Sequence, residues 1–411
     1  MTIPMDTGAS AADLNAGIPS GDDHTHLRMA LNLLTEDPRQ PSGAHWCWTR
    51  IVPEMASRLL PGEELHLMLS ASASRYFPDR GDTVRRVPFP WSNEHRVLRT
   101  ASEHLLSPVL LPLHRVDLLS TAIAPLVNPT PLLVIHMKTM HAFTAPDSLA
   151  LGPRTYRRLN YQRSVRLADA IIVNSNSLRS EIDRYLEVDQ EKVSLIYEAV
   201  DHDIFKPGDR EAARAHVSSF GISRPFVLFV SSLWRYKNCD GLLRAWRLAR
   251  HELGGRQLVI VGAERDQHYA AELRVLVDQL GIADDVVFVG AVPNEETARF
   301  YQATDALVYP SFNETFGLPI LEAMACASPV VTSNVSSMPE IAGGAALLAD
   351  PHDPGSIARA ILDATGPVGA NLRTEGLRRA QQFTWSATAA ATLDVYREVA
   401  ERRRRQRRRS R

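Results

Sequence analysis

Short apolar runs alternate with amphipathic stretches along most of the chain. In the first half, five runs rich in Val, Ile and Leu lie at residues 27–34, 65–70, 114–120, 132–137 and 169–175. The stretches between them suit helices, the clearest at residues 43–60. Continuous apolar strands separated by helices are typical of a parallel sheet that is covered on both faces. The first half is therefore predicted to be a doubly wound α/β domain.

A polar, turn-forming passage at residues 200–210 interrupts this pattern, which then restarts. Five further runs lie at residues 226–232, 257–262, 285–290, 305–311 and 329–333. We predict two Rossmann-like domains that face a cleft, with ligands at the carboxyl ends of the strands. The expected divisions are a disordered leader at 1–24, an N-terminal Rossmann-like domain at 25–205, a C-terminal Rossmann-like domain at 206–384, a crossover helix at 385–402 and a basic tail at 403–411.

Composition places the chain among globular proteins of enzyme size. It has 411 residues, of which 45% are hydrophobic and 23% charged. Its cysteines are Cys47, Cys239 and Cys326, too far apart and too few for a disulfide framework or a zinc site. The most apolar long stretch, at 105–135, is broken by charges and prolines, so no membrane span is expected. We predict a cytoplasmic protein without a cofactor or a metal.

Charge is distributed unevenly. The formal net charge is −1, and eight arginines lie between Arg402 and Arg411, so the rest of the chain carries a net charge of −9. A basic block can engage anionic lipid or nucleic acid, or it can be a plain solvated end. Without interleaved aromatic residues, and with an acidic body, nucleic acid is not expected as a partner. Weak peripheral attachment to the inner face of a membrane remains an expectation.

The segment at 312–331 carries the clearest chemistry. Glu314 and Glu322 stand eight positions apart on either side of a Phe-Gly-Leu-Pro turn that opens a helix. Unpaired amides at a helix N-terminus favour an anion such as a diphosphate. Glu322 would lie just over one turn inside the helix, where it could accept hydrogen bonds from vicinal hydroxyls, while Glu314 could hold a sugar hydroxyl. The alternative is a capped surface helix with incidental acids.

A second segment supports the first. Arg235 and Lys237 follow the predicted strand at 226–232 and precede a helix. Two cations at the carboxyl edge of a strand suit a phosphate leaving group. Alone, the pair would be better explained as solvated loop charges.

Together these residues resemble the retaining GT-B glycosyltransferases of family 4, over residues 27–402. The acidic motif matches Glu314 to Glu322, the phosphate-binding lysine matches Lys237, and residues 329–340 match a further segment of the family. The resemblance implies that Glu322 binds the ribose and that Lys237 neutralises the diphosphate. It also implies that the C-terminal helix returns to the N-terminal domain. Residues expected to hold the donor sugar with Glu314 are Thr315, Phe316, Gly317 and Leu318.

The chain departs from the family in the same region. Ser232 stands where many members carry an arginine, so Arg235 is expected to supply the second cation. Both residues are assigned to donor binding.

In the N-terminal half the resemblance places His136 at the donor sugar, as a catalytic residue beside Glu314 and Lys237. Met137 stands where members often have Asp. Gly43 is expected close to the donor phosphate, because only glycine permits such close backbone approach. A structural histidine and a plain turn are the respective alternatives.

The resemblance assigns residues 25–205 to the acceptor and residues 206–384 to the nucleotide sugar. Aromatic residues and histidines gather in the first of these domains. Tryptophan faces can stack on sugar rings, although core packing is the usual role of any one of them. The residues predicted to face the acceptor are His45, Trp46, Trp48 and His141.

We expect a glycosyltransferase that moves a hexose from a nucleotide-diphosphate sugar to a hydroxyl acceptor with retention of configuration. The Asp-x-Asp string at 201–203 lies in the interdomain passage, so it is not interpreted as a metal site. The alternatives are a non-catalytic sugar-nucleotide-binding protein and a GT-B-like sugar-nucleotide epimerase.

Overall fold

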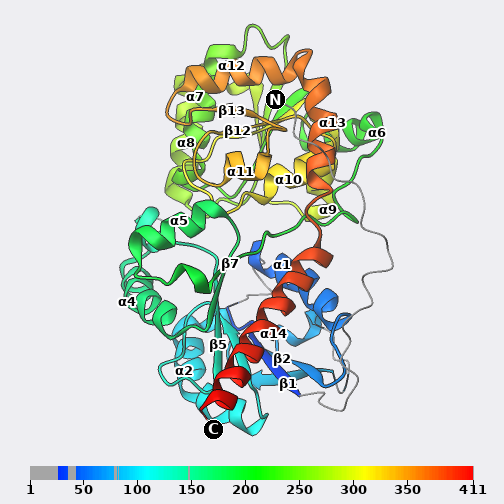
Figure 1. The fold of residues 1–411 in the computed structure, drawn as a ribbon. Helices are drawn as coiled ribbons and strands as arrows, with labels where there is room; N and C mark the ends of the chain where they lie inside the picture. The colour runs from blue at the N-terminus through cyan, green and yellow to red at the C-terminus, as the bar shows by residue number, and fades with distance from the viewer. Residues whose placement is uncertain (1–25, 36–42, 78–80, 82, 147–148, 411) are drawn as a thin grey trace, which may run out of the picture.

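The computed structural model describes residues 26–35, 43–77, 81, 83–146 and 149–410, with the side chains of residues 43–46 and of Asn93 left aside. The predicted leader at 1–24 lies outside the described residues. Two parallel sheets, each covered by helices on both faces, lie one above the other (Figure 1). The predicted α/β architecture is confirmed.

The N-terminal sheet has seven strands, and all its pairings are parallel. Helices α1 (Gly43–Ala56) and α14 (Trp385–Arg409) pack on one face. Helices α2 (Arg96–Leu113), α4 (Leu151–Leu167) and α5 (Asn176–Tyr185) cover the other. The strand order is β3 (Val84–Phe89), β2 (Glu63–Ser70), β1 (Leu27–Asn32), β4 (Leu118–Thr121), β5 (Leu132–Met137), β6 (Ala170–Val173) and β7 (Val193–Leu195).

The C-terminal sheet has six parallel strands, and the chain reverses its strand order between β8 and β11. One face packs against α7 (Cys239–Ala249), α8 (Gln267–Gln279) and α12 (Pro354–Thr365). The other packs against α6 (Arg210–Val217), α9 (Asn294–Ala303), α10 (Leu318–Ala325), α11 (Met338–Ala342) and the end of α13 (Val368–Ala380). The strand order is β10 (Val286–Gly290), β9 (Gln257–Val261), β8 (Phe226–Val230), β11 (Ala306–Tyr309), β12 (Val330–Ser333) and β13 (Leu347–Ala349).

Three strands that the sequence pattern did not indicate lie at sheet edges: β3, β7 and β13. Strands β7 and β13 have three residues each. Strand β3 contains Pro88, which lacks the amide that an inner strand needs and is tolerated at an edge. Such short or half-exposed segments carry little periodic signal.

The chain crosses between the sheets twice, at residues 196–209 and again before α14, which returns to pack on α1. Helix α14 continues to Arg409, beyond the end expected at residue 402, so the basic tail is largely helical. Glu398 pairs with Arg402 and Glu401 with Arg405, each one helical turn apart, in the favourable order. Within the described residues, no helix combines the length and apolar character needed to cross a membrane.

Candidate functional site

The loop between β11 and α10 presents free amides to the cleft. Helix α10 begins at Leu318, after Gly317 adopts a left-handed conformation with φ of 101°. The carbonyls of residues 314, 315 and 316 accept hydrogen bonds from serine hydroxyls. Within the described part of the chain, no hydrogen bond uses the amides of Phe316, Gly317 and Leu318. The loop is thus fixed through its carbonyls while its amides stay available to an anion.

Lys237 and Glu314 meet directly beside this loop. The Lys237 ammonium donates to Glu314 Oε1 at 2.5 Å and to the Tyr309 hydroxyl at 2.8 Å. The Tyr309 hydroxyl donates to the same carboxylate oxygen at 2.7 Å. Burial alone would lower the pKa of Lys237, but the adjacent carboxylate outweighs it and raises that pKa. The lysine is therefore a permanent cation in a nearly dry site.

Local backbone geometry places Lys237. A short 3₁₀ turn, Arg235–Lys237, ends at Asn238, which adopts a left-handed conformation with φ of 60°. The Asn238 amide donates to the carbonyls of Pro310 and Pro351, which ties this turn to the loop after β11. A Cβ at Gly241 would lie 2.2 Å from Asn238 Oδ1, so only glycine fits there. These contacts keep the lysine beside Glu314.

Glu322 lies in the second turn of α10, as predicted, and is half-buried. Its carboxylate accepts a hydrogen bond from the Tyr301 hydroxyl at 2.9 Å. Burial raises the pKa of Glu322 to about 7, although the bond from Tyr301 opposes the shift. The residue can therefore change charge near neutral pH.

Arg235 and Ser232 lie near the same sheet edge without joining this group. The Arg235 guanidinium pairs with Glu272 at 2.6 Å and lies over the Tyr269 ring, 5.0 Å from its centroid. It is largely exposed and is not in contact with Glu314. Ser232 follows β8, where a Cβ at Gly262 would lie 1.8 Å from the Ser231 carbonyl oxygen, so the loops after β8 and β9 touch.

His141 is the histidine that the structure brings to the C-terminal domain. It begins α3 (His141–Thr144), and its ring centroid lies 5.1 Å from that of Tyr236. Burial lowers the pKa of His141 to about 4, and Lys237 acts in the same direction against the opposing effect of Glu314. Its Nε2 atom is buried and has no partner among the described residues. A neutral imidazole thus faces the pair formed by Lys237 and Glu314.

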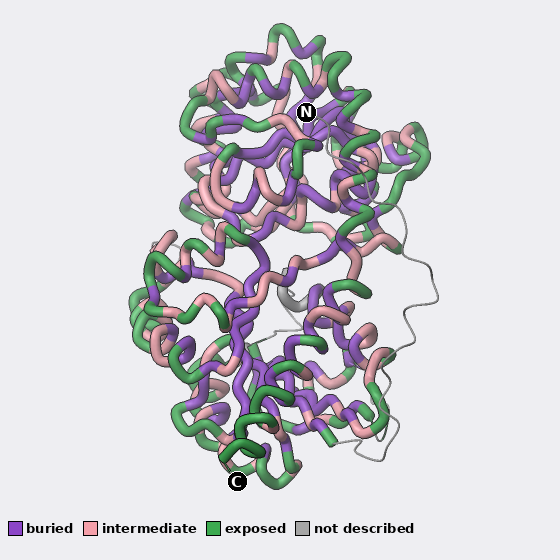
Figure 2. The backbone as a smooth tube through the Cα atoms, in the orientation of Figure 1, coloured by how far each residue is buried: buried purple, intermediate pink, exposed green. Residues whose placement is uncertain are grey.

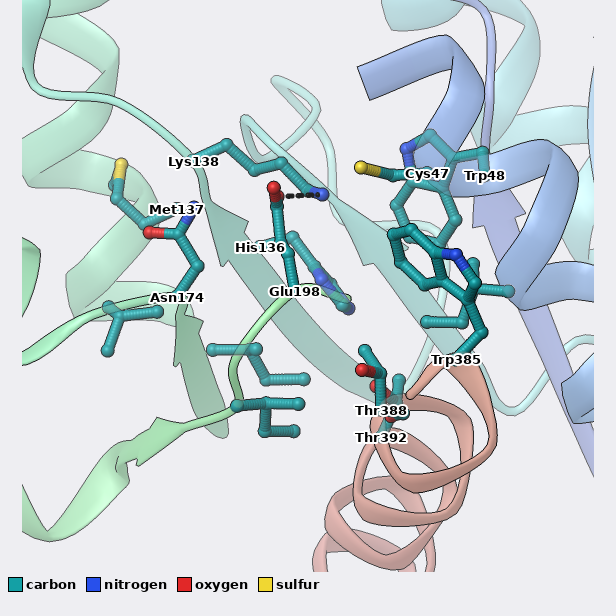
Figure 3. Close-up of a pocket in the computed structure, with 14 residues that line it drawn as sticks. Cys47, Trp48, His136, Met137, Lys138, Asn174, Glu198, Trp385, Thr388 and Thr392 are labelled. Carbon is teal, nitrogen blue, oxygen red and sulfur yellow. Dashed lines mark hydrogen bonds and ion pairs between the residues drawn. The ribbon is translucent and has the colours of Figure 1, made fainter. Parts of the chain in front are cut away.

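His136 lies elsewhere, in a cavity between the end of β5, α1 and the start of α14 (Figure 3). Its Nε2 atom is 2.9 Å from the Tyr396 hydroxyl of α14, and its ring lies 5.4 Å from that of Trp48. Burial lowers the pKa of His136 to about 3, with a contribution from Lys138. The cavity volume is about 30 Å³, room for about one water molecule. The structure does not bring His136 together with Lys237 and Glu314.

Of the other residues predicted in the N-terminal half, the structure describes the side chain of Trp48 but not those of His45 and Trp46. Trp48 is buried, lines the same cavity and has the Lys138 ammonium 5.3 Å from its ring centroid. Gly43 is the first residue of α1, but the segment before it lies outside the described residues, as do the side chains of His45 and Trp46.

The N-terminus of α5 contacts the loop between β11 and α10 from the opposite domain. Ser175 caps this helix through Leu178 and donates a hydrogen bond to the Thr315 carbonyl at 2.7 Å. The Glu340 carboxylate accepts from the Asn176 amide at 2.9 and 3.0 Å, and from the Tyr197 hydroxyl at 2.9 Å. A carboxylate at a helix N-terminus is well stabilised. The domains are therefore joined at the functional loop itself.

Sequence reasoning missed several cleft residues. Glu181 of α5 accepts a hydrogen bond from the Asn313 amide at 3.1 Å, across the domains. The second oxygen of Glu181 and the oxygen of Asn313 are buried, without partners in the described region. Unpaired buried polar atoms are costly and mark places where a polar ligand would bind. No local motif singled these residues out, because they act only once the domains meet.

The described residues contain no group of three or more His, Cys, Asp or Glu side chains that could hold a metal ion. The expected absence of a metal stays a prediction.

Comparisons with known proteins follow the same division into two halves. The family described as Glycosyl transferases group 1 matches residues 215–365, and Glycosyltransferase Family 4 matches residues 49–204. D-inositol 3-phosphate glycosyltransferase 2 of Catenulispora acidiphila is 38% identical over 263 residues, 61% of this chain and 61% of that protein. O-antigen chain mannosyltransferase B of Escherichia coli is 31% identical over 256 residues, 62% of this chain and 67% of that protein. The chain thus spans about three fifths of the length of the first of these relatives.

Solved structures agree on the architecture. Sucrose-phosphate synthase from Thermosynechococcus elongatus aligns with a TM-score of 0.73 and 20% identity, over 92% of this chain and 100% of that chain. Anabaena HepE in complex with UDP and glucose aligns with a TM-score of 0.66 and 19% identity, over 92% and 99%. At this identity the likeness concerns the fold alone. The fold alone does not identify the family, but the two family matches and the relatives do. The chain belongs to the group 1 glycosyltransferases of family 4.

Proposed function

We propose that this chain transfers a hexosyl group from a nucleotide-diphosphate sugar to a hydroxyl acceptor with retention of configuration. The observation that carries the proposal is the pairing of Lys237 with Glu314 beside the free amides at the start of α10. A diphosphate placed there would meet a buried cation and a helix N-terminus. Glu314 would then exchange its ammonium partner for sugar hydroxyls.

The nucleotide end of the donor would reach Glu322, four residues into α10. Its carboxylate suits the two ribose hydroxyls, since charge-assisted hydrogen bonds are short and strong. Arg235 would act as a second phosphate cation only by leaving Glu272, to which it is bound in this structure.

Among the residues that the structure describes, we assign no carboxylate the role of nucleophile, which favours a same-face displacement. As the glycosidic bond breaks, negative charge gathers on the diphosphate, where Lys237 and the amides would stabilise it. The departing phosphate would accept the proton of the acceptor hydroxyl. The bonds that join the domains at Thr315 and Glu340 would keep water out during this step. We propose that no metal takes part.

His141, rather than His136, is the better candidate to contact the sugar. Its Nε2 atom is buried without a hydrogen-bond partner among the described residues, whereas the Nε2 atom of His136 is bound to Tyr396. At neutral pH both rings are neutral, because their pKa values lie at about 4 and about 3. His141 would therefore act as a hydrogen-bonding partner of a sugar hydroxyl and not as a cation.

For the donor and the acceptor we propose a chemical class and not one compound. The mannosyltransferase among the relatives supports GDP-mannose, and the complexed HepE supports UDP-sugars, with dTDP-hexoses as a further possibility. The relatives named here act, by their names, on an inositol phosphate and on an O-antigen chain. The acceptor class is accordingly a hydroxyl of a glycan, a lipid-linked saccharide or a small molecule.

A panel of nucleotide sugars tests the proposal. The true donor should raise the melting temperature, because a ligand that binds only the folded state stabilises it. With that donor, NMR of the product should show the anomeric configuration of the donor. Donor binding without hydrolysis or transfer to any acceptor in the panel would favour a non-catalytic binding protein, and an inverted product would refute retention.

A matched pair of histidine variants tests which ring contacts the sugar. His141→Ala should lower turnover while leaving nucleoside diphosphate affinity unchanged, since the proposal assigns that ring to the sugar and not to the diphosphate. His136→Phe keeps a ring in the small cavity and should affect melting temperature more than turnover. The opposite ranking of turnover would return the role to His136.

A further inference from the structure

Exposed apolar side chains are concentrated on one part of the N-terminal domain. Of the eighteen large hydrophobic residues that are exposed in the described structure, ten lie on α2, on the loop after β4 and on α4. Val97, Leu105 and Leu113 of α2 are 82%, 72% and 73% exposed, and Leu151 and Leu159 of α4 are 77% and 71% exposed. The remaining five are Leu98, Val109, Leu126, Val127 and Leu167.

These segments form one surface, which we call the α2–α4 face. Both helices cover the same side of the seven-stranded sheet (Figure 1). His104 of α2 is bound to the Tyr156 hydroxyl of α4 at 2.8 Å and accepts a hydrogen bond from the Leu126 amide. Arg163 of α4 donates to the carbonyls of residues 124–126. Figure 2 shows the exposed backbone of these helices on the outer side of the domain.

The charges on this face are positive. Helix α4 contains five arginines and no acidic residue. The one acidic residue of α2, Glu103, is buried and paired with Arg99. Arg96 at the start of α2 and Arg115 just after its end are exposed. One exposed carboxylate, that of Glu187, pairs with Arg166 at the end of α4. Elsewhere leucines are interleaved with arginines, so the surface is apolar and has an excess of positive charge.

We infer that the α2–α4 face docks on an anionic lipid bilayer. Its exposed leucines and valines would enter the boundary of the acyl chains, as those of interfacial helices do. Arginine side chains can extend along such apolar surface while their guanidinium groups reach lipid phosphates. Helix α14 packs on the opposite face of the sheet, so its basic C-terminal end is separate from this surface.

The position of the face gives docking a consequence. Helix α2 follows the carboxyl end of β3, and α4 follows that of β5 and α3, so both helices begin at the sheet edge that borders the cleft. Docking would therefore bring the cleft to the bilayer surface. If the proposed transferase activity holds, a lipid-linked hydroxyl would be the acceptor best placed to reach it; the docking itself does not depend on that activity.

Vesicle flotation tests the inference with two kinds of probe. The full chain should float with vesicles that contain phosphatidylglycerol, and much less with pure phosphatidylcholine. The double variant Leu105→Gln/Val109→Gln should weaken binding to the anionic vesicles at least tenfold. Its control, Leu248→Gln/Val275→Gln, removes comparably exposed residues from the C-terminal domain and should bind as the wild type does.

Charge is tested in the same way. Arg96→Gln/Arg154→Gln should weaken binding about fivefold for each arginine removed, corresponding to about 1 kcal/mol each. The exposed pair Arg244→Gln/Arg247→Gln on α7 is the control. Melting temperatures identify variants that fail to fold, and turnover of a soluble acceptor should stay unchanged in all four. Equal vesicle binding by test and control variants would overturn the inference, as would a wild-type dimer that Leu105→Gln/Val109→Gln makes monomeric.

Discussion

Removing either Lys237 or Glu314 should lower the stability of the fold, but the two variants should differ in their affinity for nucleotide. The two side chains are nearly buried, 12% and 10% exposed, and joined at 2.5 Å. Removing one member of such a pair leaves an uncompensated buried charge, at a cost of about 3–5 kcal/mol. In Lys237→Met the Tyr309 hydroxyl still donates to the carboxylate, so we expect the lower end, about 3 kcal/mol. For a domain of this size the melting temperature should fall by roughly 6–12 °C.

Nucleoside diphosphate binding should separate the two single variants. Lys237→Met loses a charge-assisted contact worth about 1.5–3 kcal/mol, which weakens affinity about 10- to 150-fold. Glu314→Gln should bind the diphosphate at least as tightly as the wild type, because the ammonium no longer has to leave a carboxylate. Turnover should nevertheless fall, since the sugar loses its charged partner.

The double variant Lys237→Met/Glu314→Gln completes a double-mutant cycle with the two single variants. It removes both charges, so much of the lost stability should return. Calorimetric titration and thermal unfolding measure both quantities. A Glu314→Gln variant that loses affinity as severely as Lys237→Met would refute the reasoning.

Five further outcomes are expected. Because burial raises the pKa of Glu322 to about 7, its contribution to stability should be greatest at low pH and decline as the pH rises towards 7, a dependence that Glu322→Gln should abolish in thermal melts. Glu322→Gln should also weaken nucleoside diphosphate binding in calorimetry. Activity should survive excess EDTA, and a loss that Mg²⁺ restores would contradict the metal-free mechanism. Deleting residues 402–411 should leave turnover of a soluble acceptor nearly unchanged while reducing vesicle sedimentation, and a full-length protein that never sediments would exclude a membrane role for the tail. Glu340→Gln should lower kcat and also weaken nucleoside diphosphate affinity, because it destabilises the closed arrangement that the anion favours, and titration beside initial rates would show both.

The sequence predicted where Lys237, Glu314 and Glu322 lie in the fold, because the signals that place them are local. A strand end, a short loop and a helix start fix the surroundings of Lys237, and the same units place Glu314 and Glu322 on either side of the start of α10. Each relation spans a dozen residues or fewer. Pattern and spacing therefore sufficed, and the match to a known family rests on the same segments.

The N-terminal half was harder for a physical reason. His136 and His141 are five positions apart, and only the packing of distant helices decides which one reaches the cleft. His136 lies in β5, where Tyr396 of α14 holds its ring, some 260 positions along the chain. The turn into α3 carries His141 towards Tyr236 instead. The hydrophobic periodicity of one strand predicts neither of these contacts.

The contacts between the domains imply that donor binding and closure are linked. The Thr315 carbonyl accepts a hydrogen bond from Ser175, and this bond helps to fix the loop whose amides face the cleft. Opening the domains would break it, together with the bonds between Glu340 and the start of α5. The loop between β11 and α10 would then be held by contacts within its own domain, such as those from Ser336 and Ser337. An anion that prefers the fixed loop must therefore favour the closed arrangement by its differential affinity for the two states.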